Sequence, residues 1–199
     1  MKSNRSYRMK ARAEAAEQTR LDILAATAEF AVVKRLVDIS LGEVATAAGV
    51  SVQTVLRKFG SRAGLIEAAI GRVALEVDKE RPVPVGDTAA ALEVVVDEYE
   101  RRGDSLILLL AQENYDPQVH RITERDRRMH RTWVETVFAP CLPSSAEARD
   151  ELVDLLEIAT DILTWRQLRR CRALDRPTAT RRMRTLISAL LESSPGSRS

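Results

Sequence analysis

Apolar side chains recur every three or four residues along almost the whole chain, and no stretch of apolar–polar alternation is joined to a hairpin turn pair. The first spacing is typical of one face of an α-helix, whereas alternation is typical of a strand. The sequence therefore predicts an all-α fold. The expected helices cover about 13–33, 41–48, 52–59, 62–77, 88–102, 104–114, 117–138, 146–170 and 176–192.

Capping residues, glycines and prolines separate these helices. Ser40 and Glu43 have the S-x-x-E spacing of a capping box, and Gly49 is placed to end a helix in the left-handed conformation. Gly103 is expected to end another helix. Two prolines and a glycine within 81–87 predict a loop between the two halves of the chain.

Several protein classes lack support in the sequence. The longest apolar run, Leu106–Ala111, is far below the roughly 20 residues of a membrane span, and no secretory signal is present, so the expected location is cytoplasmic. No phosphate loop, nucleophile elbow or HExxH motif occurs, and His120 and His130 lie too far apart for a helical metal pair. The sequence therefore predicts no metal or cofactor, and argues against an enzyme without excluding one. Cys141 and Cys171 are expected to be reduced thiols.

The charge of the chain is unevenly distributed. Residues 1–72 carry 12 Lys or Arg against 7 Asp or Glu, whereas 73–199 carry 19 against 22. A basic first third on a nearly neutral remainder indicates a surface that binds a polyanion. Chance patterning of a charged surface is the alternative.

The stretch Leu41–Phe59 has the pattern of two short helices joined by a tight turn. Ala45 fits the close contact between the helices and Gly49 the turn, while Val50 and Val55 are expected to fill the space between them. This pattern is typical of a helix-turn-helix, whose second helix enters the major groove of DNA. A helical hairpin that binds no DNA is the alternative interpretation.

The exposed side of that second helix supplies the candidate DNA contacts. Gln53 and Thr54 suit hydrogen bonds to bases or phosphates, and Arg57 and Lys58 suit phosphates. Val52 is expected to be exposed beside them.

Four elements in this order and spacing resemble the DNA-binding domain of the TetR family of bacterial regulators, over about 19–73. The elements are the Ile-Leu-x-Ala-Ala helix ending in Phe-Ala (23–31), the Ser-Leu-x-x-Val-Ala start at Ser40, Ala-Gly-Val-Ser before a short helix ending at Phe59, and Ser-Arg before an apolar helix. The resemblance implies a homodimer that reads a palindromic operator. It also implies a helical C-terminal domain that binds a small-molecule effector.

The short helix departs from the family pattern Ser-Lys-Gly-Thr-Leu-Tyr-x-His-Phe. Leu56 replaces a tyrosine that commonly meets a phosphate and cannot donate that hydrogen bond, whereas Lys58 replaces histidine and can contact a phosphate. Arg62 matches the family's usual lysine at the start of the next helix, where a cation suits a phosphate. The full set of expected DNA contacts is Ser40, Ser51, Val52, Gln53, Thr54, Leu56, Arg57, Lys58 and Arg62.

The resemblance and the breaks together predict a domain organisation. It comprises a basic flexible arm (1–12), an N-terminal three-helix helix-turn-helix DNA-binding domain (13–72), a C-terminal helical ligand-binding and dimerisation domain (73–192) and a disordered tail (193–199). The arm has five basic residues and no acidic one. It is expected to track phosphates or to enter the minor groove, and a solvated, disordered tail is the alternative.

The C-terminal half offers a dimer interface and a candidate effector pocket. Helices near 146–170 and 176–192 have broad apolar faces, which could form a four-helix bundle between two protomers or pack within one chain. The pocket candidates are Tyr99, Gln112, His130, Trp133, Asp161 and Trp165.

The expected function is that of a transcriptional regulator, a repressor in preference to an activator. Effector binding would shift the protomers to a spacing that no longer matches two half-sites about 34 Å apart. The two rival interpretations are an architectural DNA binder without sequence preference and a helical enzyme or carrier with a vestigial first domain.

Overall fold

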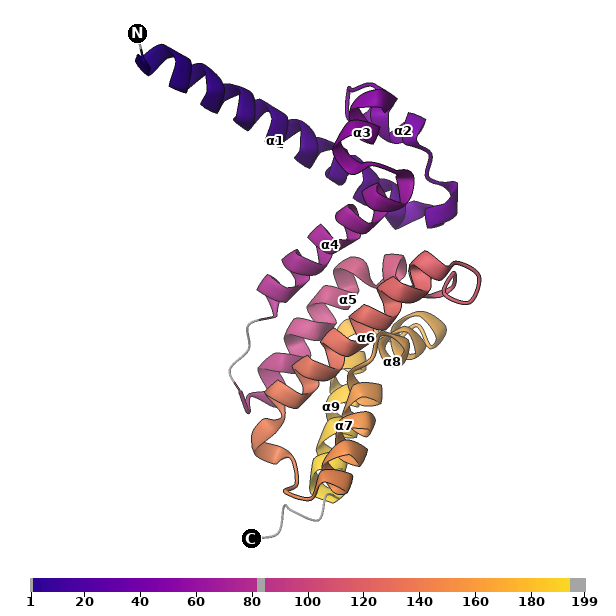
Figure 1. Ribbon diagram of the computed structural model, residues 1–199. Coiled ribbons are helices and arrows are strands. Elements are labelled where there is room, and N and C mark those ends of the chain that lie inside the picture. Colours follow the sequence, from indigo (N-terminus) through magenta and orange to yellow (C-terminus); the bar gives the residue numbers. More distant parts are fainter. Residues whose placement is uncertain (1, 82–84, 194–199) are drawn as a thin grey trace. The chain divides into compact units, whose positions relative to one another are not determined.

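The computed structural model describes residues 2–81 and 85–193, and every regular element in these ranges is helical (Figure 1). The chain forms two compact units, Met1–Leu75 and Glu76–Ser199. Residues 194–199 of the expected tail lie outside the described residues. No described helix is both long and apolar enough to cross a membrane.

The first unit contains four α-helices and one short 3-10 helix. They are α1 (Lys2–Val33), η1 (Leu36–Asp38), α2 (Leu41–Ala47), α3 (Val52–Phe59) and α4 (Arg62–Glu80), whose last residues belong to the second unit. Ser40 forms the expected capping box, since its hydroxyl accepts from the Glu43 amide and the Glu43 carboxylate accepts from the Ser40 amide. The buried core comprises Ile23, Leu24, Ala26, Leu36, Ile39, Val44, Ala45, Val55, Leu65, Ile66 and Ala69.

Helix α1 begins at Lys2, so the structure differs from the flexible arm expected over 1–12. No glycine or proline precedes Gly42, and residues 11–16 are rich in alanine and charged helix formers. Lys10 and Glu14 add an ion pair of 3.9 Å one turn apart. These local helix preferences explain why α1 begins before residue 13, the start that the apolar periodicity predicted.

The second unit is a helical bundle built on α5 (Thr88–Leu110) and α6 (Pro117–Val137). Helix α5 packs against α6, α8 (Ile162–Arg166) and α9 (Arg176–Ser193), while α7 (Ala146–Thr160) packs against α6 and α9. The short helices η2 (Ala139–Cys141) and η3 (Gln167–Cys171) complete it. Its buried core includes Leu92, Val95, Val96, Tyr99, Val134, Val137, Phe138, Leu152, Val153, Leu156, Trp165, Met183 and Ile187.

Two expected helix boundaries in this unit are wrong. Gly103 does not end a helix, because α5 runs through it to Leu110. Instead its missing side chain lets the Trp165 ring pack directly on the helix backbone. Conversely, the expected helix 146–170 is broken at Asp161, whose carboxylate accepts from the Leu163 amide at 2.7 Å and caps α8.

Gly103→Ala is expected to destabilise the second unit by about 1–3 kcal/mol, because overpacking a filled core costs energy of that order. A Cβ at this position would lie 2.5 Å from a carbon of the Trp165 ring, which is itself fully buried and has no room to move aside. Urea unfolding followed by tryptophan fluorescence measures the change, since both tryptophans belong to this unit.

Gly71→Ala in α4 is the control for this prediction. A Cβ there meets no atom within 4 Å, so alanine's helix preference is expected to raise stability by roughly 0.5–1 kcal/mol. Far-UV circular dichroism follows this variant, because Gly71 lies in the unit without tryptophan. Equal stability of Gly103→Ala and wild type would contradict the packing argument.

Candidate nucleic-acid interface and effector region

A tight turn sets the angle between α2 and α3. Gly49 adopts a φ of 65°, and the Val50 amide donates to the Ala45 carbonyl at 2.9 Å across the turn. Val55 on α3 is fully buried, as are Val44 and Ala45 on α2. The small Ala45 therefore lets the two helices pack closely, as the helix-turn-helix interpretation requires.

This packing leaves the opposite side of α3 open to solvent. Ser51 caps the helix, its hydroxyl accepting from the Thr54 amide and lying 3.0 Å from the Thr54 hydroxyl. Gln53 and Arg57 are exposed one turn apart, and neither side chain has a hydrogen-bond partner among the described residues. Val52 is exposed beside them. The exposed side of α3 therefore carries hydrogen-bond donors on Gln53 and Arg57.

Lys58 and Leu56, both predicted to contact DNA, are partly engaged within the first unit. The Lys58 ammonium donates to the Ala16 carbonyl of α1 at 2.7 Å, and Leu56 is half-buried. In addition, the Arg20 guanidinium lies 6.0 Å from the centre of the Phe59 ring. These contacts join the end of α3 to α1.

Arg62 links the start of α4 to the segment that precedes α2. Its guanidinium donates to the Ile39 carbonyl at 2.7 Å and also to the Leu36 carbonyl, so it clamps α4 to the segment before α2. The sequence placed Arg62 among the phosphate contacts, and nothing in its residue type distinguishes a clamp from such a contact. Its donors are directed at the protein's own backbone.

Ser40 and Glu43 at the start of α2 are tied into local contacts. Glu43 accepts from Lys34 at 2.5 Å and from Ser40, and these hydrogen bonds lower the pKa of Glu43 to about 2. The Lys34 ammonium also lies 5.0 Å from the centre of the Phe30 ring. The carboxylate next to the expected contact Ser40 is therefore neutralised in part by Lys34.

The second unit contains a buried polar cluster around three of the six expected effector residues. Tyr99 donates to the Thr160 carbonyl at 3.1 Å, His130 lies 3.0 Å from the Thr160 hydroxyl, and the His130 and Trp133 rings stack at 5.6 Å. The indole N–H of Trp133 is buried and has no hydrogen-bond partner among the described residues. Arg81 joins the same cluster.

Arg81 and Glu98 are functional candidates that the sequence did not indicate. Their side chains form a buried ion pair of 2.6 Å, and the Arg81 guanidinium lies 5.3 Å from the centre of the Trp133 ring. Arg81 falls in a Pro/Gly-rich stretch interpreted only as a loop. Glu98 lies between the acidic residues Asp97 and Glu100, so its charge did not distinguish it in the sequence.

The hydrogen bonds fix the neutral tautomer of His130. Arg81 can only donate, so Nδ1 accepts from it at 3.4 Å. The Thr160 hydroxyl donates to the Leu156 carbonyl at 2.7 Å, so Nε2–H donates to that hydroxyl. Burial, and then the nearby Arg81 charge, lower the pKa of His130 to about 4.

We expect folding stability to fall by about 2 kcal/mol between pH 7 and pH 5 through His130 alone. Its pKa of about 4 in the folded protein lies below the ordinary 6.5, so the unfolded chain binds the proton first as pH falls. The loss begins near pH 6.5 and levels off near pH 4. Urea unfolding of wild type and His130→Gln at both pH values measures it.

The His130→Gln variant is needed because other groups titrate nearby. Burial raises the pKa of Asp126 and of Asp161, and protonation of these carboxyls favours the folded state as pH falls. They affect both proteins alike, so the difference between the two pH dependences belongs to His130. Parallel curves for the two proteins would contradict the assignment.

The other three expected effector residues are placed differently. Trp165 is fully buried 6.1 Å from the Tyr99 ring, and its indole N–H donates to Glu100 at 2.8 Å. Asp161 is the cap of α8 described above. Gln112 donates to the Leu108 carbonyl near the end of α5, roughly 20 Å along that helix from Tyr99.

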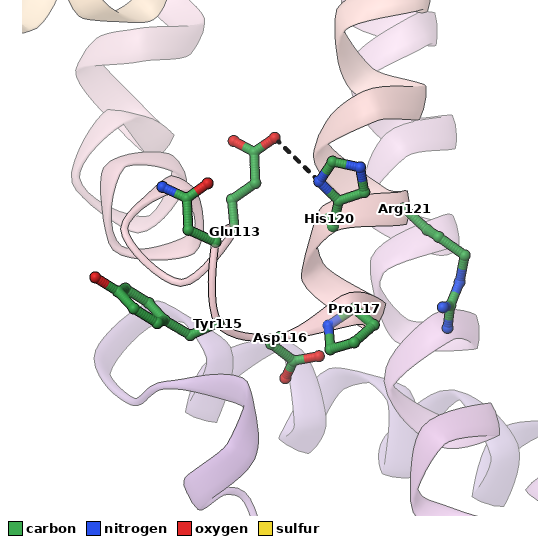
Figure 2. Close-up of a pocket in the computed structure, with 7 residues that line it drawn as sticks. Glu113, Tyr115, Asp116, Pro117, His120 and Arg121 are labelled. Carbon is green, nitrogen blue, oxygen red and sulfur yellow. Dashed lines mark ion pairs between the residues drawn. The ribbon is translucent and has the colours of Figure 1, made fainter.

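A hollow of about 470 Å³ lies at the junction of α5 and α6. Figure 2 shows Glu113 reaching toward His120, and their side chains are 3.6 Å apart. Asp116 at its edge caps α6. None of the six expected effector residues lines this hollow, which is bordered by Glu113, Asn114, Tyr115, Asp116, Pro117, His120 and Arg121.

No family model and no curated protein matches the sequence. Solved structures do match. A transcriptional regulator from Rhodococcus sp. Rha1 is 19% identical with a TM-score of 0.69, over 88% of this chain and 97% of that one. NalD, the secondary repressor of the MexAB-OprM multidrug efflux pump in Pseudomonas aeruginosa, is 21% identical with a TM-score of 0.63, over 93% of this chain and 100% of its own.

A third solved structure carries the family name. It is a protein from Mesorhizobium loti described as a TetR-family transcriptional regulator, 18% identical with a TM-score of 0.59, over 89% of this chain and 96% of that one. These matches cover 88% or more of this chain and so extend over both units, including the helix-turn-helix geometry of α2 and α3. The chain therefore has the fold of the TetR family of transcriptional regulators.

Proposed function

We propose that this chain is a sequence-specific DNA-binding transcriptional regulator, not an enzyme, that acts in the cytoplasm as a repressor. The observation that carries the proposal is the exposed polar face of α3, where Gln53 and Arg57 lie one turn apart without partners in the described chain. Buried Val55 fixes the helix on its other side. A short helix held in this way can enter the major groove with its N-terminal residues toward the bases.

The side chains of α3 suggest a division of roles. Gln53 lies in the first turn and is suited to the bidentate contact that glutamine makes with adenine. Arg57, one turn later, is suited to a phosphate. Ser51, Val52 and Thr54 form the rest of the DNA-facing end. Leu56 and Lys58 contribute at its edge, while Ser40 and Arg62 position the helices.

A homodimer is supported by apolar side chains left exposed on α7, α8 and α9. One part of the broad apolar faces expected from the sequence packs within the chain, where Leu152, Leu156 and Met183 are buried. Leu155, Ile158, Leu163 and Leu186 remain 40%, 64%, 53% and 48% exposed. A second copy would cover this surface and form a four-helix bundle from two helices of each protomer.

An effector would act by shifting the population of two dimer states. The cluster of Tyr99, His130 and Trp133 is the proposed place for effector contacts, because a buried indole donor there has no partner in the described residues. A ligand that favours protomer spacings unlike the half-site spacing would release the operator. Equal operator affinity with and without every ligand in a broad screen would leave the effector without support.

Selection of DNA fragments from genomic DNA with the purified protein tests the proposal. We expect the recovered fragments to share a palindrome whose half-sites are about one helical turn apart. Recovery of fragments with no shared sequence would favour an architectural DNA binder. Failure to retain any duplex at low salt would exclude DNA binding and direct attention to the second unit as a carrier or enzyme.

A further inference from the structure

The N-terminal half of α1 carries its charges on opposite sides. At about 100° per residue, Arg8, Arg12 and Ala16 follow one another within roughly 80° of the helix circumference. Arg8 and Arg12 are exposed. Lys10 lies roughly 160° from both arginines and is paired with Glu14 at 3.9 Å. One face of this helix is therefore basic, and the charges of the other face are partly compensated.

The basic face is aligned with the end of α3. The Lys58 ammonium of α3 donates to the Ala16 carbonyl, which lies one turn beyond Arg12 on the same side of α1. Figure 1 shows the N-terminal part of α1 continuing past α2 and α3. Arg8 lies roughly 12 Å beyond Ala16 along the helix, which equals the rise of three to four base pairs of DNA.

We propose that Arg8 and Arg12 form an arginine stripe that binds the DNA sugar-phosphate backbone next to the bases read by α3. This inference rests on the proposed DNA-binding function and adds a second contact surface to it. A basic arm can contact phosphates or enter the minor groove, and the helical form of α1 favours the first of these contacts. A helix about 10–12 Å wide does not fit a minor groove about 6 Å wide, so the stripe lies along phosphates.

The matched pair Arg12→Gln and Lys10→Gln tests the stripe in the full chain. Both changes remove one positive charge from exposed positions two residues apart, and both keep a good helix former. Each phosphate contact contributes about 0.9 to the slope of log K against log salt concentration, so Arg12→Gln should reduce the slope by about 1.8 in a dimer. This corresponds to roughly thirtyfold weaker binding at 0.15 M salt.

Fluorescence anisotropy titrations over a range of salt concentrations give these slopes for the selected operator and for a random duplex. We expect Arg12→Gln to weaken both complexes by the same factor, since phosphate contacts carry no sequence information, and Lys10→Gln to leave the slope unchanged. Equal slope changes in the two variants would overturn the stripe and indicate only a diffuse basic field. An unchanged slope in Arg12→Gln would also overturn it.

The failure of the proposed function is distinguishable from the failure of the stripe. Absence of any preferred site in the wild type would refute the sequence-specific regulator, yet the slopes on random duplex would still decide whether Arg12 contacts phosphate. Arg12→Lys is the rescue variant, and it should restore the wild-type slope because lysine also neutralises a phosphate. Circular dichroism confirms that each variant keeps its helix content.

Discussion

Gln53→Ala is expected to lower the ratio of operator affinity to random-duplex affinity by at least about thirtyfold. Gln53 is exposed in the first turn of α3, where no described residue competes for its amide. A bidentate base contact is worth about 1–3 kcal/mol, and a dimer makes the contact once in each half-site. Because the side chain is exposed and has no hydrogen-bond partner among the described residues, the variant should unfold at nearly the same denaturant concentration as wild type.

Arg57→Ala is the matched comparison for this result. Arg57 is exposed one turn further along the same face of α3, so its removal alters the same surface. As a phosphate contact it should weaken operator and random duplex equally and leave the affinity ratio unchanged. A Gln53→Ala protein that keeps the wild-type ratio would show that α3 does not read bases through this residue.

Replacing Leu155 and Ile158 together by glutamate is expected to convert the dimer into a monomer. These side chains on α7 are 40% and 64% exposed, and burying a carboxylate in an apolar interface without a partner costs several kcal/mol. Operator affinity should fall by at least about a thousandfold, because a monomer binds only one half-site. Sedimentation velocity at micromolar concentration measures the mass, and titration measures the affinity.

Met129→Glu on α6 is the control for the dimer prediction. Met129 is 38% exposed and lies on a helix outside the proposed interface, so it tests whether any new surface carboxylate has the same effect. This variant should remain a dimer. A wild-type protein that sediments as a monomer at micromolar concentration would contradict the interface before any substitution is made.

Local patterns predicted the first unit well. The spacing that placed a helix at 52–59 and a capping box at Ser40 depends on residues close in sequence, and α3 and the capping box have those bounds and contacts. The helix-turn-helix corner is likewise set by the turn at Gly49 and the small residue Ala45. The start of α1 was missed because a solvent-exposed helix needs no apolar periodicity.

Long-range contacts explain the rest of the errors. In the sequence, a glycine that ends a helix cannot be told from a glycine that makes room for a bulky ring. Only the position of the Trp165 ring shows that Gly103 is of the second kind. Arg62 was predicted only as a phosphate contact, and its hydrogen bonds to the Ile39 and Leu36 carbonyls were missed because the fold brings these partners to it. Arg81 was hidden in a loop, and its ion pair with Glu98 depends on the packing of the second unit.

The affinity ratio between the selected operator and a random duplex, measured at one stated salt concentration, decides whether this chain is a sequence-specific regulator. Sequence-specific regulators bind their sites about a thousandfold or more tighter than random DNA. We predict a ratio of at least that size for the wild-type dimer, carried by the exposed face of α3. A ratio near one would contradict the account and leave the chain as a DNA binder without sequence preference.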